Sequence, residues 1–302
     1  MKSMRIPLIV ATGITLLGMI FGFFFDLQIS QAIATPGTGF GLAFSVVAPT
    51  LGFCGLAALG GAIFKIGLDR KDSKGIKITC LIVGVLAVGV SIYFGGQEFF
   101  GENGYYKAAP MIVGYLIAAI VHAGAFVGGF FLAKNNKNDK AWIYILVAMG
   151  VAFIALVAFT TGLKAIFHRP RYRLLVAQND TSLFYRLFAR CGNYKELMAH
   201  YGVTSEEFKS FPSGHTCEAS VLIIFVVFMP FFNEKLTKLQ LPCFVVAFAI
   251  VILTGLSRIL AGAHYLSDVS TGAFVTLLTL LVANEILPHI KSLQPKPVEA
   301  AE

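Results

Sequence analysis

The sequence predicts an all-α polytopic membrane protein, a bundle of about eight transmembrane helices. Of its 302 residues, 57% are hydrophobic and only 13% are charged, whereas a soluble domain carries about a quarter charged residues. Several apolar runs also reach the ~18–20 residues that a helix needs to cross a bilayer. Because a spanning segment must satisfy its own backbone hydrogen bonds, we expect each run to be helical.

The apolar runs define the expected spans in order along the chain. They lie at residues 6–25, 47–66, 76–95, 109–133, 141–163, 214–232, 241–260 and 268–287. The second run is rich in glycine and alanine. The five cysteines show neither zinc spacing nor a disulfide pattern, so we interpret them as packing residues.

Lysine-rich loops set the expected orientation of these helices. Residues 68–75, 134–140 and 233–240 are lysine-rich, whereas residues 26–46 contain no lysine or arginine. Positive loops face the cytoplasm, so both termini are predicted to be cytoplasmic, in agreement with an even number of spans. The lysines and arginines of cytoplasmic loops therefore explain the net charge of +8, which we do not interpret as a sign of nucleic-acid binding. The basic segment 164–210 is an exception, because it is predicted to lie on the outer side.

Within that outer segment, "TSEEF" predicts a capping box between Thr204 and Glu207. At the start of the same segment, where the fifth span ends, "KAIFHRPRY" contains Lys164, Arg169 and Arg171. Cations at span ends commonly extend toward the interface, and this structural interpretation stays open for them. Their position outside, against the charge bias, favours a function.

A second cluster, "FPSGHT", precedes the sixth span. Pro212 fixes φ, Ser213 is a good N-cap, and Gly214 lets another group approach the backbone. The unpaired N–H groups of such a helix start can bind an anion, with His215 in the first turn beside it. A capped helix start with an incidental histidine is the alternative.

The third cluster is "SRILAGAHYLSD", with Arg258, His264 and Asp268. His264 and Asp268 are four residues apart, so on a helix they would share a face. A carboxylate that accepts from one ring nitrogen fixes the tautomer and leaves the other nitrogen free to act. The alternative is an interfacial pair without chemistry.

The predicted topology places all three clusters at the outer face. Their cations, helix N-terminus and histidines suit a dianionic phosphate, with one histidine to attack phosphorus and one to protonate the leaving oxygen. No carboxylate cluster suited to magnesium is apparent in the sequence, so we expect a reaction without metal or other cofactor. The converging residues are Lys164, Arg171, Ser213, His215, Arg258, His264 and Asp268.

At these residues the chain resembles the type-2 phosphatidic acid phosphatase family, whose pattern is Lys-x6-Arg-Pro, Pro-Ser-Gly-His and Ser-Arg-x5-His-x3-Asp. The second motif is complete at 212–215 and the third at 257–268. In the first, Lys164 and Arg171 have the right spacing, but Tyr172 stands where the family has proline. Since Pro170 follows Arg169, either arginine could be the ligand; the spacing favours Arg171.

The resemblance implies a role for each residue. His264 would be the nucleophile that forms a phosphohistidine, Asp268 would orient it, and His215 would be the acid. The phosphoryl oxygens would be bound by Lys164, Arg171, Ser213, Gly214 and Arg258. His168 matches no motif position and is interpreted as an interfacial histidine.

The resemblance covers residues 141–287. We therefore divide the chain into N-terminal helices (1–133), a phosphatase core (134–290) with outer loop 172–210, and a disordered cytoplasmic tail (291–302). The expected protein is a lipid phosphatase of a bacterial cell membrane, with its active site at the outer face. Expected substrates are phosphatidate, phosphatidylglycerol phosphate or a polyprenyl diphosphate. A phosphatase or phosphotransferase for a soluble phosphoester, and a transporter, are alternatives; the oligomeric state is left open.

Overall fold

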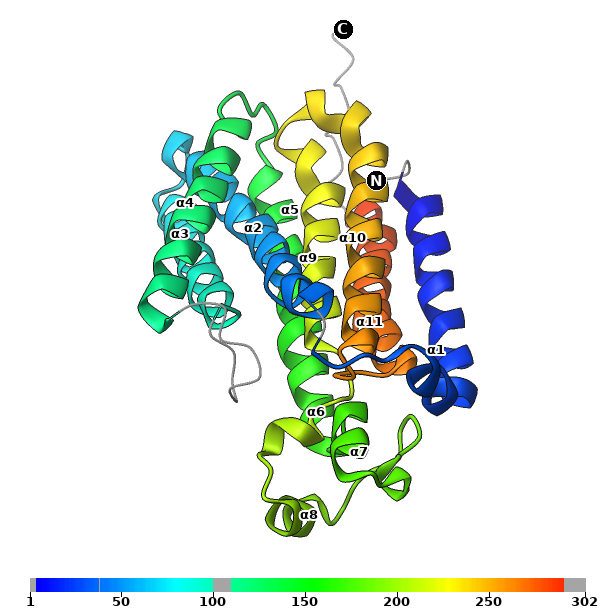
Figure 1. The fold of residues 1–302 in the computed structure, drawn as a ribbon. Coiled ribbons are helices and arrows are strands. Elements are labelled where there is room, and N and C mark those ends of the chain that lie inside the picture. Colours follow the sequence, from blue (N-terminus) through cyan, green and yellow to red (C-terminus); the bar gives the residue numbers. More distant parts are fainter. Residues whose placement is uncertain (1–3, 38, 100–109, 291–302) are drawn as a thin grey trace, which may run out of the picture.

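The computed structural model describes residues 4–37, 39–99 and 110–290, apart from the side chain of Leu42. Every regular element in these ranges is helical (Figure 1). Eight helical segments are long and apolar enough to cross a membrane, which confirms the expected spans. They are α1 (Arg5–Ile33), α2 (Gly39–Asp69), α3 (Lys74–Gln97), α4 (Met111–Leu132), the segment Ala141–Gln178 that begins with α5 (Ala141–Phe153), α9 (Gly214–Phe228) with the 3-10 turn after it, α10 (Gln240–Leu260) with the turn before it, and α11 (Leu266–Ile286) with the turn after it.

Helix α1 continues well past the predicted end of its span at residue 25. Asp26 and Ser30 lie in this extension and are buried, and α1 packs along α11. Asp26 therefore does not end the helix, because the protein interior provides partners for its carboxylate. These partners include Arg169 and the N–H of Ser267 in the first turn of α11.

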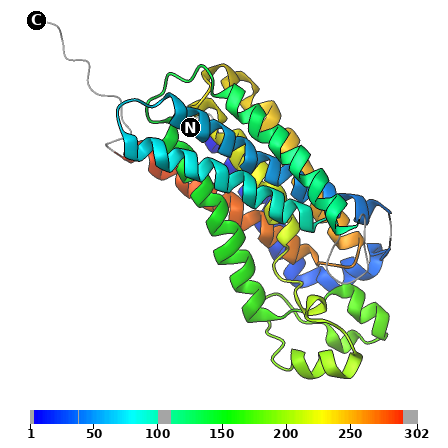
Figure 2. The same cartoon turned by 90° about the vertical axis from the view of Figure 1, so that its left-hand side faces the viewer.

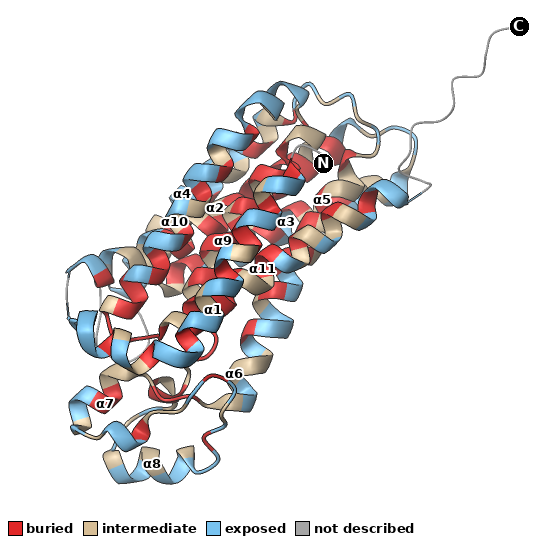
Figure 3. Cartoon of the chain, turned by 90° about the vertical axis from the view of Figure 1, so that its right-hand side faces the viewer, coloured by how far each residue is buried: buried red, intermediate tan, exposed pale blue. Residues whose placement is uncertain are grey.

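Helices α9 and α2 lie at the centre of the bundle, with α1 at one edge and the α3–α4 pair at the other (Figures 1 and 2). The burial of side chains agrees with these positions. Buried residues are concentrated on α9 and α2, and exposed apolar residues on the outer helices (Figure 3). A helix that is apolar on all sides is expected in such a central position.

The glycines of α2 and α4 have a packing role. A Cβ atom at Gly61 would lie 1.8 Å from the carbonyl oxygen of Phe126, and one at Gly129 would lie 1.9 Å from that of Ala58. The two backbones can touch only because these side chains are absent, as in other close helix pairs of membranes. This close packing accounts for the glycine content of the second span.

Short helices from the end of the fifth span to the start of the sixth lie at one end of the bundle. They are α6 (Gly162–Phe167), α7 (Tyr172–Gln178), α8 (Tyr194–Tyr201) and the 3-10 turn Ser205–Phe208 (Figure 1). The predicted capping box is wrong, because Thr204 makes no side-chain cap hydrogen bond. The carboxylate of Glu207 instead accepts from Arg173, with a shortest distance of 2.5 Å, since a charged, two-point partner outcompetes a single backbone N–H.

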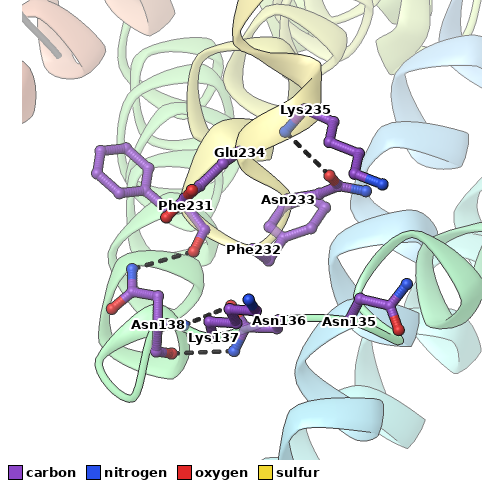
Figure 4. Close-up of a pocket in the computed structure, with 9 residues that line it drawn as sticks. All are labelled: Asn135, Asn136, Lys137, Asn138, Phe231, Phe232, Asn233, Glu234 and Lys235. Atoms are coloured by element: carbon purple, nitrogen blue, oxygen red, sulfur yellow. Dashed lines mark hydrogen bonds between the residues drawn. The ribbon is translucent and has the colours of Figure 1, made fainter.

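The described ends of the chain lie at the opposite end of the bundle, where Arg5 Nε is 3.1 Å from Glu285 Oε1. The loops there enclose a hollow of about 620 Å³ lined by asparagines, lysines and phenylalanines (Figure 4). Asn138 donates from its amide to the carbonyl oxygen of Phe231 across it, at 3.0 Å. Its lining contains no histidine and none of the motif residues, and we assign this hollow no catalytic role.

Candidate active site

The structure brings the three sequence clusters together at the end of the bundle that carries α7 and α8. A cavity of about 680 Å³ opens there, and its lining includes Lys164, Arg171, His215 and Arg258. Lys164 lies on α6, Arg171 is the N-cap of α7, and Arg258 is in the last turn of α10. Three cations from separate segments therefore face one space, an arrangement suited to an anion.

The start of α9 faces the same region. Ser213 caps the helix, because its side chain accepts from the N–H of Thr216 at 3.5 Å, which confirms its predicted role as N-cap. The N–H of Ser213 donates to the carbonyl oxygen of Asp268 at 3.0 Å, which ties this helix start to the first turn of α11. A Cβ atom at Gly214 would lie 3.1 Å from Lys164 Nζ, so glycine lets the ammonium group approach the backbone.

The imidazole rings of His215 and His264 face each other across this site. Their centroids are 6.4 Å apart and the rings are inclined by 58°. His215 lies in the first turn of α9, and His264 lies in the turn between α10 and α11. The two histidines are thus held by separate segments of the chain, one by a helix and one by a turn.

His264 is oriented by a backbone group. Its Nδ1 lies 2.5 Å from the carbonyl oxygen of Ser210, so Nδ1 carries the proton and Nε2 is left with its lone pair. Burial and the cations Arg171, Lys164 and Arg258 lower the pKa of His264 well below its usual range. The imidazole is therefore neutral at physiological pH, the form that can attack as a nucleophile.

The expectation that His264 and Asp268 share a helical face is wrong, because α11 begins only at Leu266. Asp268 instead forms hydrogen bonds with residues that adjoin His264. Its Oδ2 accepts from Ser210 Oγ at 2.5 Å and from the N–H of Tyr265 at 2.9 Å. Asp268 therefore fixes Ser210, whose carbonyl oxygen in turn fixes the imidazole of His264.

The two arginines of "RPR" have different surroundings. Arg169 is 1% exposed and donates to Asp268 at 2.6 Å and to Asp26 at 2.9 Å. Arg171 lines the cavity, with its guanidinium 3.6 Å from Glu206 and its Nε without a partner in the described structure. The arginine chosen by spacing is thus the one beside the cavity, whereas Arg169 belongs to a buried ion-pair network.

Carboxylates from the N-terminal helices were missed by the sequence analysis. Asp26 of α1 accepts from the N–H of Ser267 at 2.9 Å, and Glu98, just after α3, has its Oε2 3.3 Å from Nε2 of His215. Both are acidic residues inside or at the end of an apolar run. This costly position could have marked them in the sequence.

Glu98 and His168 both line the cavity. Burial raises the pKa of Glu98 to about 7, although Arg258 and Lys164 act in the opposite direction. His168, which matched no motif, lines the cavity and stacks on Tyr194 with ring centroids 3.8 Å apart. The ring of His168 thus packs against an aromatic side chain in the lining of the cavity.

The chain is similar to known proteins over the part that contains the three clusters. The family model of the PAP2 superfamily matches residues 141–290. A curated protein of Haemophilus influenzae, named phosphatidylglycerophosphatase B, is 32% identical over 224 residues, which cover 67% of this chain and 88% of that protein. No solved structure matches the chain.

Proposed function

Because the chain belongs to the PAP2 superfamily of phosphatases, we propose that it hydrolyses the phosphate monoester of a membrane lipid through a phosphohistidine on His264. Phosphatidylglycerol phosphate is the first candidate substrate, since the H. influenzae relative is named for that activity. Eight apolar helices make the protein an integral membrane phosphatase.

The observation that carries the proposal is the pair of histidine rings 6.4 Å apart beside a cation-lined cavity. A phosphoryl group between the rings would have its attacking and leaving atoms in line, as the displacement requires. Nε2 of His264 would attack phosphorus while the bond from phosphorus to the lipid oxygen breaks. His215 would give its proton to that oxygen.

The charge that develops on the phosphoryl oxygens would be stabilised by Lys164, Arg171 and Arg258, together with the start of α9. Ser213 and the N–H of Gly214 would supply its donors at that helix start. In the second half of the reaction, His215 would take a proton from water. The resulting hydroxide would attack phosphorus, break its bond to Nε2 of His264 and release inorganic phosphate.

We place the site at the outer face of the membrane. In the structure the lysine-rich loops 134–140 and 233–240 lie at the end opposite to α7 and α8, and positive loops face the cytoplasm. A lipid headgroup in the outer leaflet would then reach the cavity laterally.

A diphosphate lipid is a second candidate, favoured by the size of the cavity. About 680 Å³ exceeds what one phosphate fills, and Arg173 and Lys209 are further cations in its lining. Both are already paired with glutamates, so a second phosphate would have to displace these partners. This cost ranks the diphosphate below the monoester.

The test is phosphate release by purified protein in detergent micelles, with a chelator and no added metal. The panel consists of phosphatidylglycerol phosphate, phosphatidate, a polyprenyl diphosphate and glucose 6-phosphate, compared by kcat/KM. We expect turnover of the lipid monoesters and none by His264→Ala. Preference for glucose 6-phosphate would indicate a soluble substrate, and the absence of any release, with solute movement in vesicles, would indicate a transporter.

A further inference from the structure

Glu98 connects the N-terminal helices to the proposed acid. Its Oε2 lies 3.3 Å from Nε2 of His215, and both side chains are about one-fifth exposed at the edge of the cavity. Glu98 directly follows α3, and the family model matches only residues 141–290. The contact is therefore supplied by a part of the chain outside the matched core.

Close packing holds the end of α3 in place. A Cβ atom at Gly95 would lie 2.4 Å from the ring of His122, and one at Gly96 would lie 2.3 Å from the ring of Tyr115, both on α4. Phe94 also stacks on Phe53 of α2, with centroids 6.0 Å apart. Neighbouring helices on both sides thus fix the position from which Glu98 reaches His215.

The charges around His215 explain why a carboxylate matters there. Lys164, Arg171 and Arg258 face it from α6, the start of α7 and α10, and the ring of His264 lies across the site. Positive neighbours oppose the cationic imidazolium that a proton donor requires. Glu218, one turn along α9, and Glu98 are the acidic groups that counter them.

From this geometry we propose that Glu98 is a positioning residue that holds a proton on Nε2 of His215 until the leaving oxygen takes it. The proposal rests on the proposed function, because it assigns a partner to that reaction's acid. When the bond from phosphorus to oxygen breaks, the proton moves from Nε2 to the oxygen and His215 becomes neutral. Glu98 keeps its own carboxylate throughout this step.

The properties of Glu98 agree with such a role. Its pKa of about 7 is close to that of an ordinary imidazole. The side chain therefore ionises near neutral pH, and its carboxylate form is the one that can support the imidazolium of His215.

The experiment compares substrates with poor and good leaving groups. Phosphatidylglycerol phosphate has an alkoxide leaving group that needs a proton, whereas 4-nitrophenyl phosphate has one that does not. We expect Glu98→Gln to lower kcat for the lipid about 10–100-fold, a part of the 10²–10⁴ that general acid catalysis contributes. KM should change less than about 3-fold, as should kcat for the aryl phosphate.

Two further variants complete the design. Glu98→Asp keeps the charge and should recover part of the lost kcat, and it serves as the test if Glu98→Gln fails to fold. Glu234→Gln removes a carboxylate at the opposite end of the bundle and should leave both substrates unaffected. Equal losses on both substrates, or no loss on the lipid, would overturn the role of Glu98.

The phosphatase proposal itself is tested separately in the same assay. Wild-type protein must release phosphate and His264→Ala must not. If these two results hold and the Glu98 variants show no leaving-group dependence, the positioning role fails while the function stands. If the wild-type protein releases none, the proposed function fails first.

Discussion

The backbone carbonyl oxygen of Ser210 lies 2.5 Å from Nδ1 of His264, and the hydroxyl of the same serine donates to Asp268 at 2.5 Å. One residue thus joins the proposed nucleophile to the carboxylate that the motif pairs with it. Asp268 acts on His264 through the position of a backbone group.

This relay predicts graded losses of activity. Ser210→Ala keeps the carbonyl acceptor and loses one hydrogen bond of about 1–1.5 kcal/mol, so kcat should fall roughly 10-fold. Asp268→Asn disturbs the contacts with Arg169, Ser210 and Tyr265 together and should reduce kcat by more than about 100-fold. Single-turnover rates of both variants check this. An unaffected Ser210→Ala beside an inactive Asp268→Asn would show that Asp268 acts on His264 directly.

A covalent intermediate should be trappable on His264. Protein mixed with lipid labelled in its phosphate and quenched in alkali, where a phosphoramidate survives, should retain label in the wild type and none in His264→Ala. His200→Gln, which alters an exposed histidine of α8, is the matched control and should retain label. Label that persists in His264→Ala would place the intermediate elsewhere.

Loss of the proposed acid should depend on the leaving group. His215→Asn removes the proton donor, so turnover of a lipid phosphate should fall by at least about 100-fold, while 4-nitrophenyl phosphate should be affected far less. Steady-state kcat values for the two substrates provide the comparison. Losses of the same size on both would count against His215 as the acid.

Substitution of Arg169 is expected to lower stability, whereas substitution of Arg171 is expected to weaken anion binding. Arg169→Gln leaves Asp26 and Asp268 buried without their cation, and breaking such a pair costs about 3–5 kcal/mol, so Tm should drop. Arg171→Gln should keep Tm and weaken inhibition by vanadate, which mimics the five-coordinate phosphorus. Thermal unfolding in detergent and vanadate inhibition constants measure both. Normal vanadate inhibition of Arg171→Gln would remove Arg171 from the site.

The proposed orientation can be tested by cysteine labelling. A membrane-impermeant maleimide should label Thr181→Cys, near α7, in intact cells, and Asn135→Cys only after permeabilisation. Both positions are exposed, and the wild-type chain with its five free cysteines provides the background. Labelling of Asn135→Cys alone in intact cells would invert the orientation and place the site at the cytoplasmic face.

The sequence by itself determined the eight spans and the three clusters of site residues. A bilayer permits few structures for an apolar run of that length, so hydropathy alone predicts each helix. Motif spacing is equally local, because Ser213, Gly214 and His215 are neighbours at one helix start. These features needed no knowledge of which helices are neighbours.

Only the tertiary structure decided which groups surround the site residues. Arg169 and Asp26 are 143 residues apart in sequence, and Ser210 and Asp268 are 58 apart. Glu98 follows α3, whereas His215 lies in α9. A buried charge binds the partner that packing brings to it, and packing depends on the whole bundle. For this reason motif spacing could favour Arg171, but only the folded chain showed that Arg169 is committed to two buried carboxylates.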